Sequence, residues 1–306
     1  MSATSNMPVI APVAPHQRAE ALRLVFSRLP EADRPSQVNT LLASIDSGAV
    51  RPRGLLGAYR DGRLAGAILS QAQSGKTAIL WSPRLISGEP TSTAESLLSA
   101  ACAALAKQRL RMAQALMPID SESDQALLRT GGFEFLADLL YLVSVETDFP
   151  RSKPSSPLEF ETYCPENHGR LAQIVESTYE QTLDCPTLNG VREIGDVLIG
   201  YRSQGEFHPG NWMIVRHDGR DVGCLVLTDY SHQGNVELVY MGIVSTARGH
   251  GWGIDVTRHA QWLAALAGRP RLVLAVDTKN RPAIEMYAAV GFRAWDRRRV
   301  FVKMFS

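Results

Sequence analysis

Residues 242–253 read Gly-Ile-Val-Ser-Thr-Ala-Arg-Gly-His-Gly-Trp-Gly, and they join the end of an apolar run to the start of a long amphipathic segment. The glycines at 249, 251 and 253 let a ligand approach the backbone closely. Backbone N–H groups at the start of a helix, with the positive end of the helix dipole behind them, attract phosphate or pyrophosphate. The stretch therefore predicts an anion-binding loop between a strand and a helix.

A second motif follows in residues 280–292, which read Asn-Arg-Pro-Ala-Ile-Glu-Met-Tyr-Ala-Ala-Val-Gly-Phe. Proline near the first helical position is preorganised for a helix start, and Gly291 suits the left-handed conformation that ends one. The motif predicts a short helix that carries Tyr287 within its last two turns. A Rossmann dinucleotide fingerprint is excluded, because Ile254 occupies the position of its third glycine.

Together the two motifs resemble those of the GNAT acetyltransferase superfamily. In that family Arg/Gln-x-x-Gly-x-Gly/Ala heads a helix, and Asn-x-x-Ala-x-x-x-Tyr-x-x-x-Gly-Phe follows; here these are residues 248–253 and 280–292. The resemblance implies an α/β (α+β) fold with a mixed, mostly antiparallel central sheet flanked by helices. It implies acetyl-CoA as the acyl donor and direct attack by a primary amine of a small molecule or peptide, with no metal.

The resemblance also assigns roles to residues. Tyr287 is expected to protonate the departing CoA thiolate, and the alternative is that it only packs with Phe292. A backbone N–H near Gly242 or Ile243, at the strand bulge of the family, is expected to stabilise the oxyanion. His250 touches a phosphate or is simply solvated. The residues expected to bind the cofactor are Gly242, Ile243, Val244, Arg248, Gly249, His250, Gly251, Trp252, Gly253, Asn280 and Tyr287.

Glu237 is the expected catalytic base. An ammonium group has no lone pair with which to attack a thioester, so the acceptor must lose a proton first. Glu237 lies six residues before Ile243, the spacing at which some GNAT enzymes carry their glutamate base. Strand alternation puts it on the same face as Val239 and Met241. The alternative is a glutamate at an edge or on the surface.

Three further groups of residues have open interpretations. Glu176, Glu180 and Asp184 are four residues apart and form an acidic stripe if one helix carries them, either to attract a cationic amine or as a solvated face. Cys185 is either reactive or a small buried apolar residue. Arginines 297–299 are expected to be charge on an edge strand, with contact to the CoA 3′-phosphate as the alternative.

Hydrophobic periodicity predicts the elements of the second half of the chain. Helices are expected at 167–182, 191–203, 251–267 and 282–290. Strands are expected at 158–163, 212–216, 222–228, 236–244, 272–276 and 300–304.

The first half repeats this pattern without its chemistry. Asp61-Gly62 matches Asp218-Gly219 as a hairpin turn, and Gly132-Phe133 matches Gly291-Phe292. Residues 149–157 hold three prolines and three serines, as a linker does. We therefore expect two tandem GNAT folds, a degenerate domain at 1–150 with a flexible or extended leader of fifteen residues and a catalytic domain at 156–306, a layout like that of the mycothiol synthase type.

An offset of 159 residues between the repeats predicts which chemical groups the first half lacks. It places Ala78 at the position of Glu237 and Leu128 at that of Tyr287. Residues 87–90, Ser-Gly-Glu-Pro, replace the start of the glycine loop, so a phosphate there meets a negative charge and a missing N–H. The first half is expected to serve packing or to wall the acceptor site.

Composition limits the partners. The 306 residues are 45% hydrophobic with a net charge of +1, which gives no electrostatic reason to expect nucleic acid or a membrane surface. Four cysteines without a CxxC pair favour the reducing cytoplasm, and neither a signal peptide nor a membrane span is expected. Two other functions stay open: a pseudoenzyme that binds acyl-CoA or a partner protein, and a Fem-type aminoacyl transferase, which needs a basic groove for tRNA.

Overall fold

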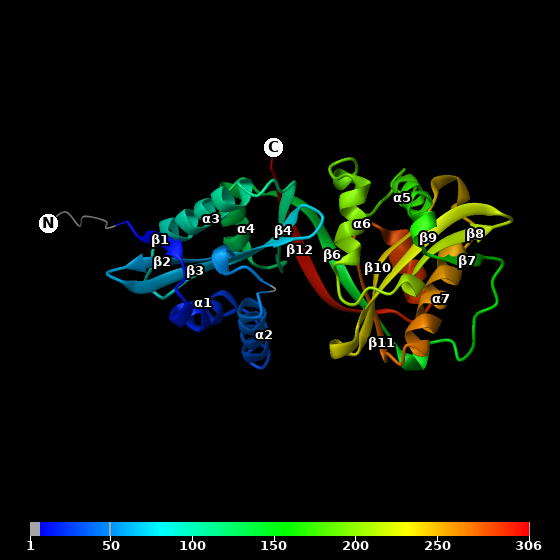
Figure 1. Cartoon of the computed structure of the whole chain (residues 1–306), viewed down its shortest axis with the longest axis horizontal. Helices are drawn as coiled ribbons and strands as arrows, with labels where there is room; N and C mark the ends of the chain where they lie inside the picture. The colour runs from blue at the N-terminus through cyan, green and yellow to red at the C-terminus, as the bar shows by residue number, and fades with distance from the viewer. Residues whose placement is uncertain (1–6, 49, 306) are drawn as a thin grey trace. The chain divides into compact units, whose positions relative to one another are not determined.

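The computed structural model describes residues 7–48 and 50–305 (Figure 1), and the contacts among Cα atoms divide the chain into two compact units. Unit 1 runs to Phe135 and includes the residues from Val300 onward. Unit 2 runs from Leu136 to Arg299. The chain therefore passes between the units within two strands, β6 (Glu134–Val145) and β12 (Arg293–Met304).

Unit 2 is a mixed sheet with helices on both faces. Its strands lie in the order β6-β11-β10-β9-β8-β7, and all neighbours are antiparallel except β10 and β11, which are parallel. The elements are β7 (Glu159–Thr162), α5 (His168–Ser177), α6 (Ile194–Arg202), β8 (Trp212–His217), β9 (Arg220–Tyr230), β10 (Asn235–Ile243), α7 (Trp252–Leu266), β11 (Arg271–Asp277) and α8 (Arg281–Ala289).

Strand alternation divides the apolar residues of unit 2 into two cores. Along β8, Trp212 and Ile214 pack against α5 and α6, whereas Met213 and Val215 pack against α7 and α8. Figure 1 shows α6 and α7 on opposite sides of the strands. The turn between β8 and β9 has positive φ at both Asp218 and Gly219, which is the reason for the Asp-Gly sequence there.

Strands β10 and β11 pair over a short length only. Three residue pairs join them, from Asn235 with Arg271 to Glu237 with Val273. Immediately beyond, the register of β10 with β9 shifts between Leu238 and Tyr240, so Val239 is an extra residue. Such a bulge bends and twists a strand. The two parallel strands therefore separate toward their C-terminal ends, and this separation makes room for the candidate site.

Unit 1 repeats the same order of elements, with strands β1 to β5 adjacent in that order. Helices α1 and α2 pack on one face of this sheet, and α3 and α4 pack on the other with Phe301 of β12. The elements are β1 (Val9–Pro12), α1 (Arg18–Val25), α2 (Arg34–Asp46), β2 (Leu55–Arg60), β3 (Arg63–Gln73), β4 (Thr77–Leu85), α3 (Thr91–Ala106), β5 (Met112–Pro118) and α4 (Glu122–Thr130). The predicted fold class, a mixed and mostly antiparallel sheet flanked by helices, is confirmed.

The division into units differs from the predicted boundary near residues 150–156. Residues 149–157 have no helix or strand, but they lie inside unit 2. The reason is β6, which ends the first repeat in sequence yet pairs with β11 of the second through seven residues, Leu139 to Val145. The paired residues of β6 and β11 lie 126 or more residues apart in the chain. The local sequence pattern of either strand therefore does not show that they pair.

Two predicted boundaries also change. Helix α5 ends at Ser177, short of the predicted 182, and β12 begins at Arg293 instead of 300. The leader was expected to be flexible or extended; its residues Val9–Pro12 are extended, form β1 and pair with β2, while residues 1–6 lie outside the described residues. Among the described helices, none combines the length and the apolar character that crossing a bilayer demands.

We predict that the fragment 156–306 does not fold, because it lacks β6. It loses Leu142 from the core, the Gln261 to Ser144 hydrogen bond of 2.8 Å, and the partner strand of β11. An unpaired, apolar strand edge favours aggregation. Thermal unfolding followed by circular dichroism checks this, with the fragment 136–299 as the matched control that keeps β6. A cooperative transition for 156–306 equal to that of 136–299 would contradict the assignment of β6 to unit 2.

Candidate active site

A cavity of about 530 Å³ occupies the space where β10 and β11 separate. The loop between α5 and α6 covers it, and the start of α8 closes one side. Five of the residues expected from the sequence contribute to its wall: Gly242, Ile243, Arg248, Asn280 and Tyr287. Glu237, Val244 and residues 249–253 do not line it. The cavity lies entirely within unit 2.

The glycine loop beside the cavity has the features of an anion site. Gly249 and Gly251 have φ of 88° and 76°, a left-handed conformation that favours glycine. Within the described residues, the backbone N–H groups from 249 to 253 donate no backbone hydrogen bond. They precede and begin α7, whose dipole adds positive potential. Donors in this arrangement are of the kind that binds phosphate groups, and the binding of a pyrophosphate here stays a prediction.

The side chain of Arg248, which the family resemblance assigns to the pyrophosphate, forms hydrogen bonds to backbone carbonyl groups in this structure. Its guanidinium donates to the carbonyl oxygens of Ile243 at 3.1 Å, Gln181 at 3.1 Å and Thr178 at 2.8 Å. These bonds fasten the glycine loop to the end of β10 and to the residues that follow α5. A cation at a helix C-terminus also interacts favourably with the dipole. In this conformation Arg248 holds the loop in place, and its role toward pyrophosphate stays a prediction.

His250 is stacked on Trp252, with 4.6 Å between ring centroids. The ring of His217, at the end of β8, lies 4.6 Å from the indole of Trp252 as well. The indole of Trp252 therefore contacts two imidazole rings. This contact anchors the first helical residue of α7 to the sheet and fixes the direction in which the glycine loop enters the helix.

Tyr287 both packs and lines the cavity. It is 5% exposed, and its ring centroid lies 5.4 Å from that of Phe292. Burial raises the pKa of its phenol, and the charge of Asp184 adds to the rise. The hydroxyl is thus protonated at neutral pH, as a proton donor must be. Asn280, seven residues earlier, caps α8 by accepting a hydrogen bond from Ala283 N–H at 3.3 Å.

Gly242 is required for a close approach between β10 and the residue after α5. A Cβ atom at this position would lie 2.7 Å from Cβ of Thr178, closer than side chains tolerate. The Thr178 hydroxyl in turn lies 2.6 Å from that of Tyr240. The bulge expected near Gly242 or Ile243 lies earlier, at Val239. That prediction was wrong, because the sequence pattern of β10 is equally apolar on both sides of the irregularity.

Glu237 shares a face of β10 with Val239, as predicted, but not with Met241. Because Val239 is an extra residue, Glu237 and Tyr240 oppose Thr228 and Val226, which share a face of β9. Met241 packs in the other core, with α7. Burial raises the pKa of the Glu237 carboxyl, and a hydrogen bond with Tyr230 partly opposes the rise. Its role as base stays a prediction, but its side chain does not reach the cavity wall.

The predicted acidic stripe is not one helix face, since α5 ends at Ser177. Glu176 and Glu180 are exposed and do not line the cavity, and Glu180 accepts a hydrogen bond from Ser245 at 2.6 Å. Only Asp184 lines the cavity. Because α5 ends before Glu180, the three carboxylates do not share a helix face, although they are spaced four residues apart in the sequence.

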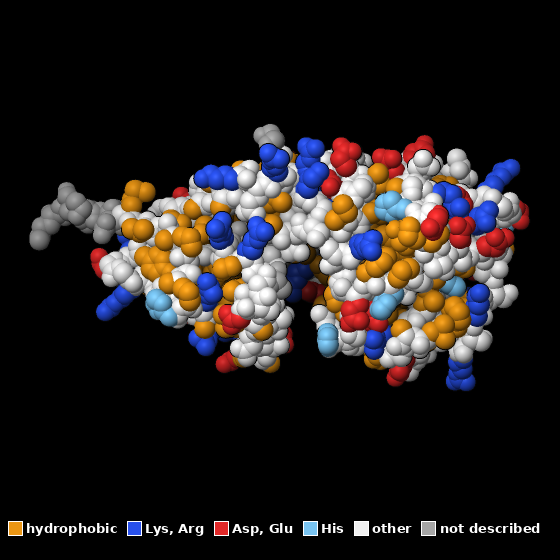
Figure 2. Space-filling view, viewed as in Figure 1, with side chains coloured by type: hydrophobic (Ala, Val, Ile, Leu, Met, Phe, Trp, Pro, Cys, Tyr) orange, Lys and Arg blue, Asp and Glu red, His pale blue; other side chains and the backbone are white. Residues whose placement is uncertain are grey.

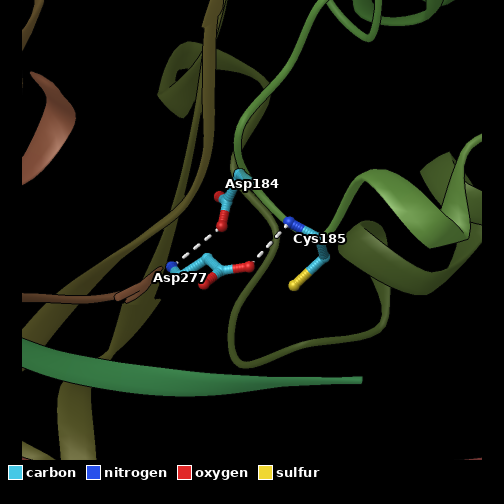
Figure 3. A group of neighbouring side chains, drawn as sticks. All are labelled: Asp184, Cys185 and Asp277. Atoms are coloured by element: carbon cyan, nitrogen blue, oxygen red, sulfur yellow. Dashed lines mark hydrogen bonds between the residues drawn. The ribbon is translucent and has the colours of Figure 1, made fainter. Parts of the chain in front are cut away.

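Asp184 and Asp277 hold each other's chain segments (Figure 3). The Asp184 Oδ1 atom accepts the N–H of Asp277 at 2.9 Å, and Asp277 Oδ2 accepts the N–H of Cys185 at 3.3 Å. Asp277 ends β11 and was missed in the sequence, where its position three residues before Asn280 was the available signal. Burial, with Asp184 and then Asp277 nearby, raises the pKa of the Cys185 thiol to about 12, which makes it a poor nucleophile.

Two of the arginines at 297–299 have a buried partner and are not free surface charge. Arg297 and Arg299 bind the carboxylate of Asp138 on β6, at 3.0 and 2.7 Å. Hydrogen bonding from Arg299 lowers the pKa of Asp138, against the effect of burial. Arg298 pairs with Asp296 at 2.7 Å. These contacts join β12 to β6, and β12 is not an edge strand of the sheet, so the expectation of charge on an edge strand was wrong for all three arginines.

Unit 1 lacks the corresponding groups. Leu128 is the seventh residue of α4 as Tyr287 is of α8, in agreement with the sequence offset. The third pair of β4 with β5 involves Ile79, so Ile79 and not Ala78 stands where Glu237 does. Glu89 lies at the start of α3. Its carboxylate accepts hydrogen bonds from Arg60 Nε at 2.9 Å and from the Thr93 hydroxyl at 3.0 Å. A carboxylate thus occupies the place of a bound anion.

Charged side chains of both signs lie on the surface of unit 2. On the face shown in Figure 2, basic and acidic side chains are interspersed over this unit. This agrees with the near-neutral composition of the chain.

Comparisons with known proteins support the resemblance. Residues 174–292 match the acetyltransferase (GNAT) family. Over 95 residues the chain is 32% identical to mycothiol acetyltransferase of Thermobifida fusca (strain YX); this covers 31% of the chain, which spans only 27% of that relative's length. A solved GCN5-related N-acetyltransferase from Sphaerobacter thermophilus shares the fold over 98% of this chain and 96% of its own, with a TM-score of 0.69 at 15% identity.

A tandem GNAT protein from the clavulanic acid biosynthesis pathway also shares the fold. Its TM-score is 0.57 at 15% identity, over 97% of this chain and 98% of that one. That structure therefore shares the fold of this chain over nearly the whole length of both.

We predict that Gly242→Ala lowers the free energy of unfolding by about 1–3 kcal/mol, because the new methyl group overlaps Thr178. Urea denaturation measures this. Gly253→Ala is the matched control, since a Cβ there meets Met286 at an ordinary 3.6 Å. Equal stability of the two variants would show that the approach of Thr178 to β10 is not tight.

Proposed function

Because residues 174–292 match the GNAT acetyltransferase family, we propose that this chain transfers the acetyl group of acetyl-CoA to a primary amine of a small molecule or peptide. The amine attacks the thioester directly. One observation carries the proposal: among the described residues, the N–H groups of residues 249–253 donate no backbone hydrogen bond, and they stand at the start of α7, next to the cavity that Tyr287 lines. Anion recognition and a proton donor therefore adjoin one space.

The cofactor assignment follows from the geometry of β10. The N–H groups between Arg248 and Gly253, with His250 and Trp252 in the same loop, would bind the pyrophosphate. Beyond Glu237, β10 no longer pairs with β11. An extended, amide-rich pantetheine arm would pair with the edge that includes Gly242, Ile243 and Val244, as a peptide adds to a sheet. Asn280 lines the same cavity.

Proton transfer completes the proposed reaction. Tyr287 would give its proton to the departing sulfur, and its burial keeps that proton in place until needed. Glu237 is the carboxylate predicted from sequence to receive the proton of the amine, and this role stays a prediction. The carbonyl oxygen would receive a backbone N–H from β10 near Gly242 or Ile243.

We propose that unit 1 binds no acyl-CoA and serves packing. The Glu89 carboxylate at the start of α3 would repel a second anion, and Leu128 has no proton to give.

All four cysteines of the chain are free thiols, which supports a reducing compartment such as the cytoplasm.

We predict one acetyl-CoA site per chain, which calorimetric titration measures. The variant Gly251→Asp should lose at least about tenfold in affinity, a difference of about 1.4 kcal/mol, because a carboxylate faces the pyrophosphate. Gly251→Asn is the matched control: it has nearly the same shape, no charge, and tolerates positive φ. If both variants bind alike, the loop is not the anion site. If the wild type binds no acetyl-CoA, the enzyme proposal fails.

We predict that Tyr287→Phe lowers kcat by about 10²-fold or more and leaves the dissociation constant of acetyl-CoA unchanged. The phenyl ring keeps the contact with Phe292, so the fold is preserved. Steady-state kinetics with calorimetry separate the two quantities. An unchanged kcat would leave Tyr287 with packing only. Acetyl-CoA binding without turnover of any amine by the wild type would favour the pseudoenzyme alternative.

A further inference from the structure

We propose that Asp184, held by Asp277, is the group that takes the proton from the acceptor amine. This rests on the proposed acetyl transfer and assigns its base to the loop between α5 and α6. Glu237 was expected in that role, but it lies outside the cavity wall, whereas Asp184 belongs to it together with Tyr287. The two groups that exchange protons in the reaction then face one space.

The hydrogen bonds divide the work between the two carboxylates. Both oxygens of Asp277 are engaged, Oδ2 by Cys185 N–H at 3.3 Å and Oδ1 by Lys279 N–H at 2.9 Å. Asp277 is 2% exposed. Asp184 accepts through Oδ1 only, from Asp277 N–H at 2.9 Å, and its second oxygen accepts no hydrogen bond from the described residues. Asp277 is thus a positioning residue, and Asp184 keeps a lone pair for a proton.

The surroundings of Asp184 make it a suitable proton acceptor. Asp184 lines the cavity, and although the residue as a whole is exposed, neighbouring protein atoms partly desolvate its carboxyl. Burial raises its pKa, the hydrogen bond from Asp277 N–H opposes the rise, and the nearby Asp277 carboxylate adds to it. The titratable or charged groups around the same space are Asp277, Cys185, Tyr179, Tyr201, Tyr240, Tyr287, Arg192 and Arg248.

The proton and electron balance of the step is complete. One proton of the ammonium moves to the free oxygen of Asp184, and the nitrogen lone pair forms a bond to the acetyl carbonyl carbon. The bond from that carbon to sulfur then breaks. Tyr287 gives its proton to the sulfur, and the second proton leaving the nitrogen restores the phenol. Asp184 releases its proton to solvent through the cavity.

The test compares two nucleophiles with the full-length chain. Phenethylamine is an ammonium ion at neutral pH and needs a base, whereas hydroxylamine is uncharged there and does not. Asp184→Asn can still accept the Asp277 N–H. We expect it to lower kcat/KM for phenethylamine by about 10²-fold or more and to abolish the low-pH limb of its profile. The rate with hydroxylamine and the affinity for acetyl-CoA should change little.

Thermal stability supplies a readout independent of turnover. An acid whose pKa is raised by folding stabilises the folded state fully at low pH, and that contribution is lost as pH rises through the folded pKa. The Asp184→Asn variant has no carboxyl to ionise at this position, so it does not lose this stability as the pH rises. Its Tm should therefore equal or exceed that of the wild type at pH 7, and the advantage should shrink in acid. A purely structural aspartate predicts a lower Tm instead.

Two matched variants decide between carboxylates. Glu180→Gln changes a carboxylate four residues away that does not line the cavity, so its rates should match the wild type. Equal losses with both nucleophiles in Asp184→Asn, or an unchanged phenethylamine profile, would overturn the proposal. A lower rate with phenethylamine but not with hydroxylamine in the Glu237→Gln variant would also overturn the proposal. If the wild type acetylates neither nucleophile, the acetyl transfer proposal itself fails and Asp184 loses its role with it.

Discussion

The short pairing of β10 with β11 is the constraint on which the site depends. Three residue pairs hold these parallel strands together, and the extra residue Val239 then turns β10 away. A fully paired sheet would leave neither a cavity nor an open strand edge. The separated ends carry the glycine loop on one strand and the Asp277 to Asn280 corner on the other. One local irregularity thus brings the residues that we propose for cofactor binding and proton transfer around or beside a common space.

Several interactions keep that space from closing. Arg248 bonds to three backbone carbonyls across the glycine loop, β10 and the end of α5. The reciprocal bonds of Asp184 and Asp277 join the loop after α5 to β11. Beneath them, β6 supports β11 through seven residue pairs, although β6 ends the first repeat in sequence. Unit 2 is therefore complete only with a strand that the order of repeats would assign elsewhere.

The two units differ at the helix start where we propose an anion site in unit 2. Both place a helix start after the fourth strand of the repeat, so the dipole and the backbone donors are available in each. In unit 2 the N–H groups of residues 249–253 donate no backbone hydrogen bond among the described residues. In unit 1 Glu89 supplies a carboxylate, held by Arg60 and Thr93. The Glu89 carboxylate thus supplies, at the positive end of the α3 dipole, the negative charge that a bound phosphate would supply.

The sequence alone determined the order of elements, the fold class, the Asp-Gly hairpins and the two motifs, because each depends on residues close together in the chain. It placed Leu128 opposite Tyr287 correctly for the same reason. Only the tertiary structure decided which strand completes unit 2, which face Glu237 occupies, and which carboxylate lines the cavity. A single bulge reverses strand alternation, and the contact of Asp184 with Asp277 joins residues 93 apart, so neither leaves a local pattern.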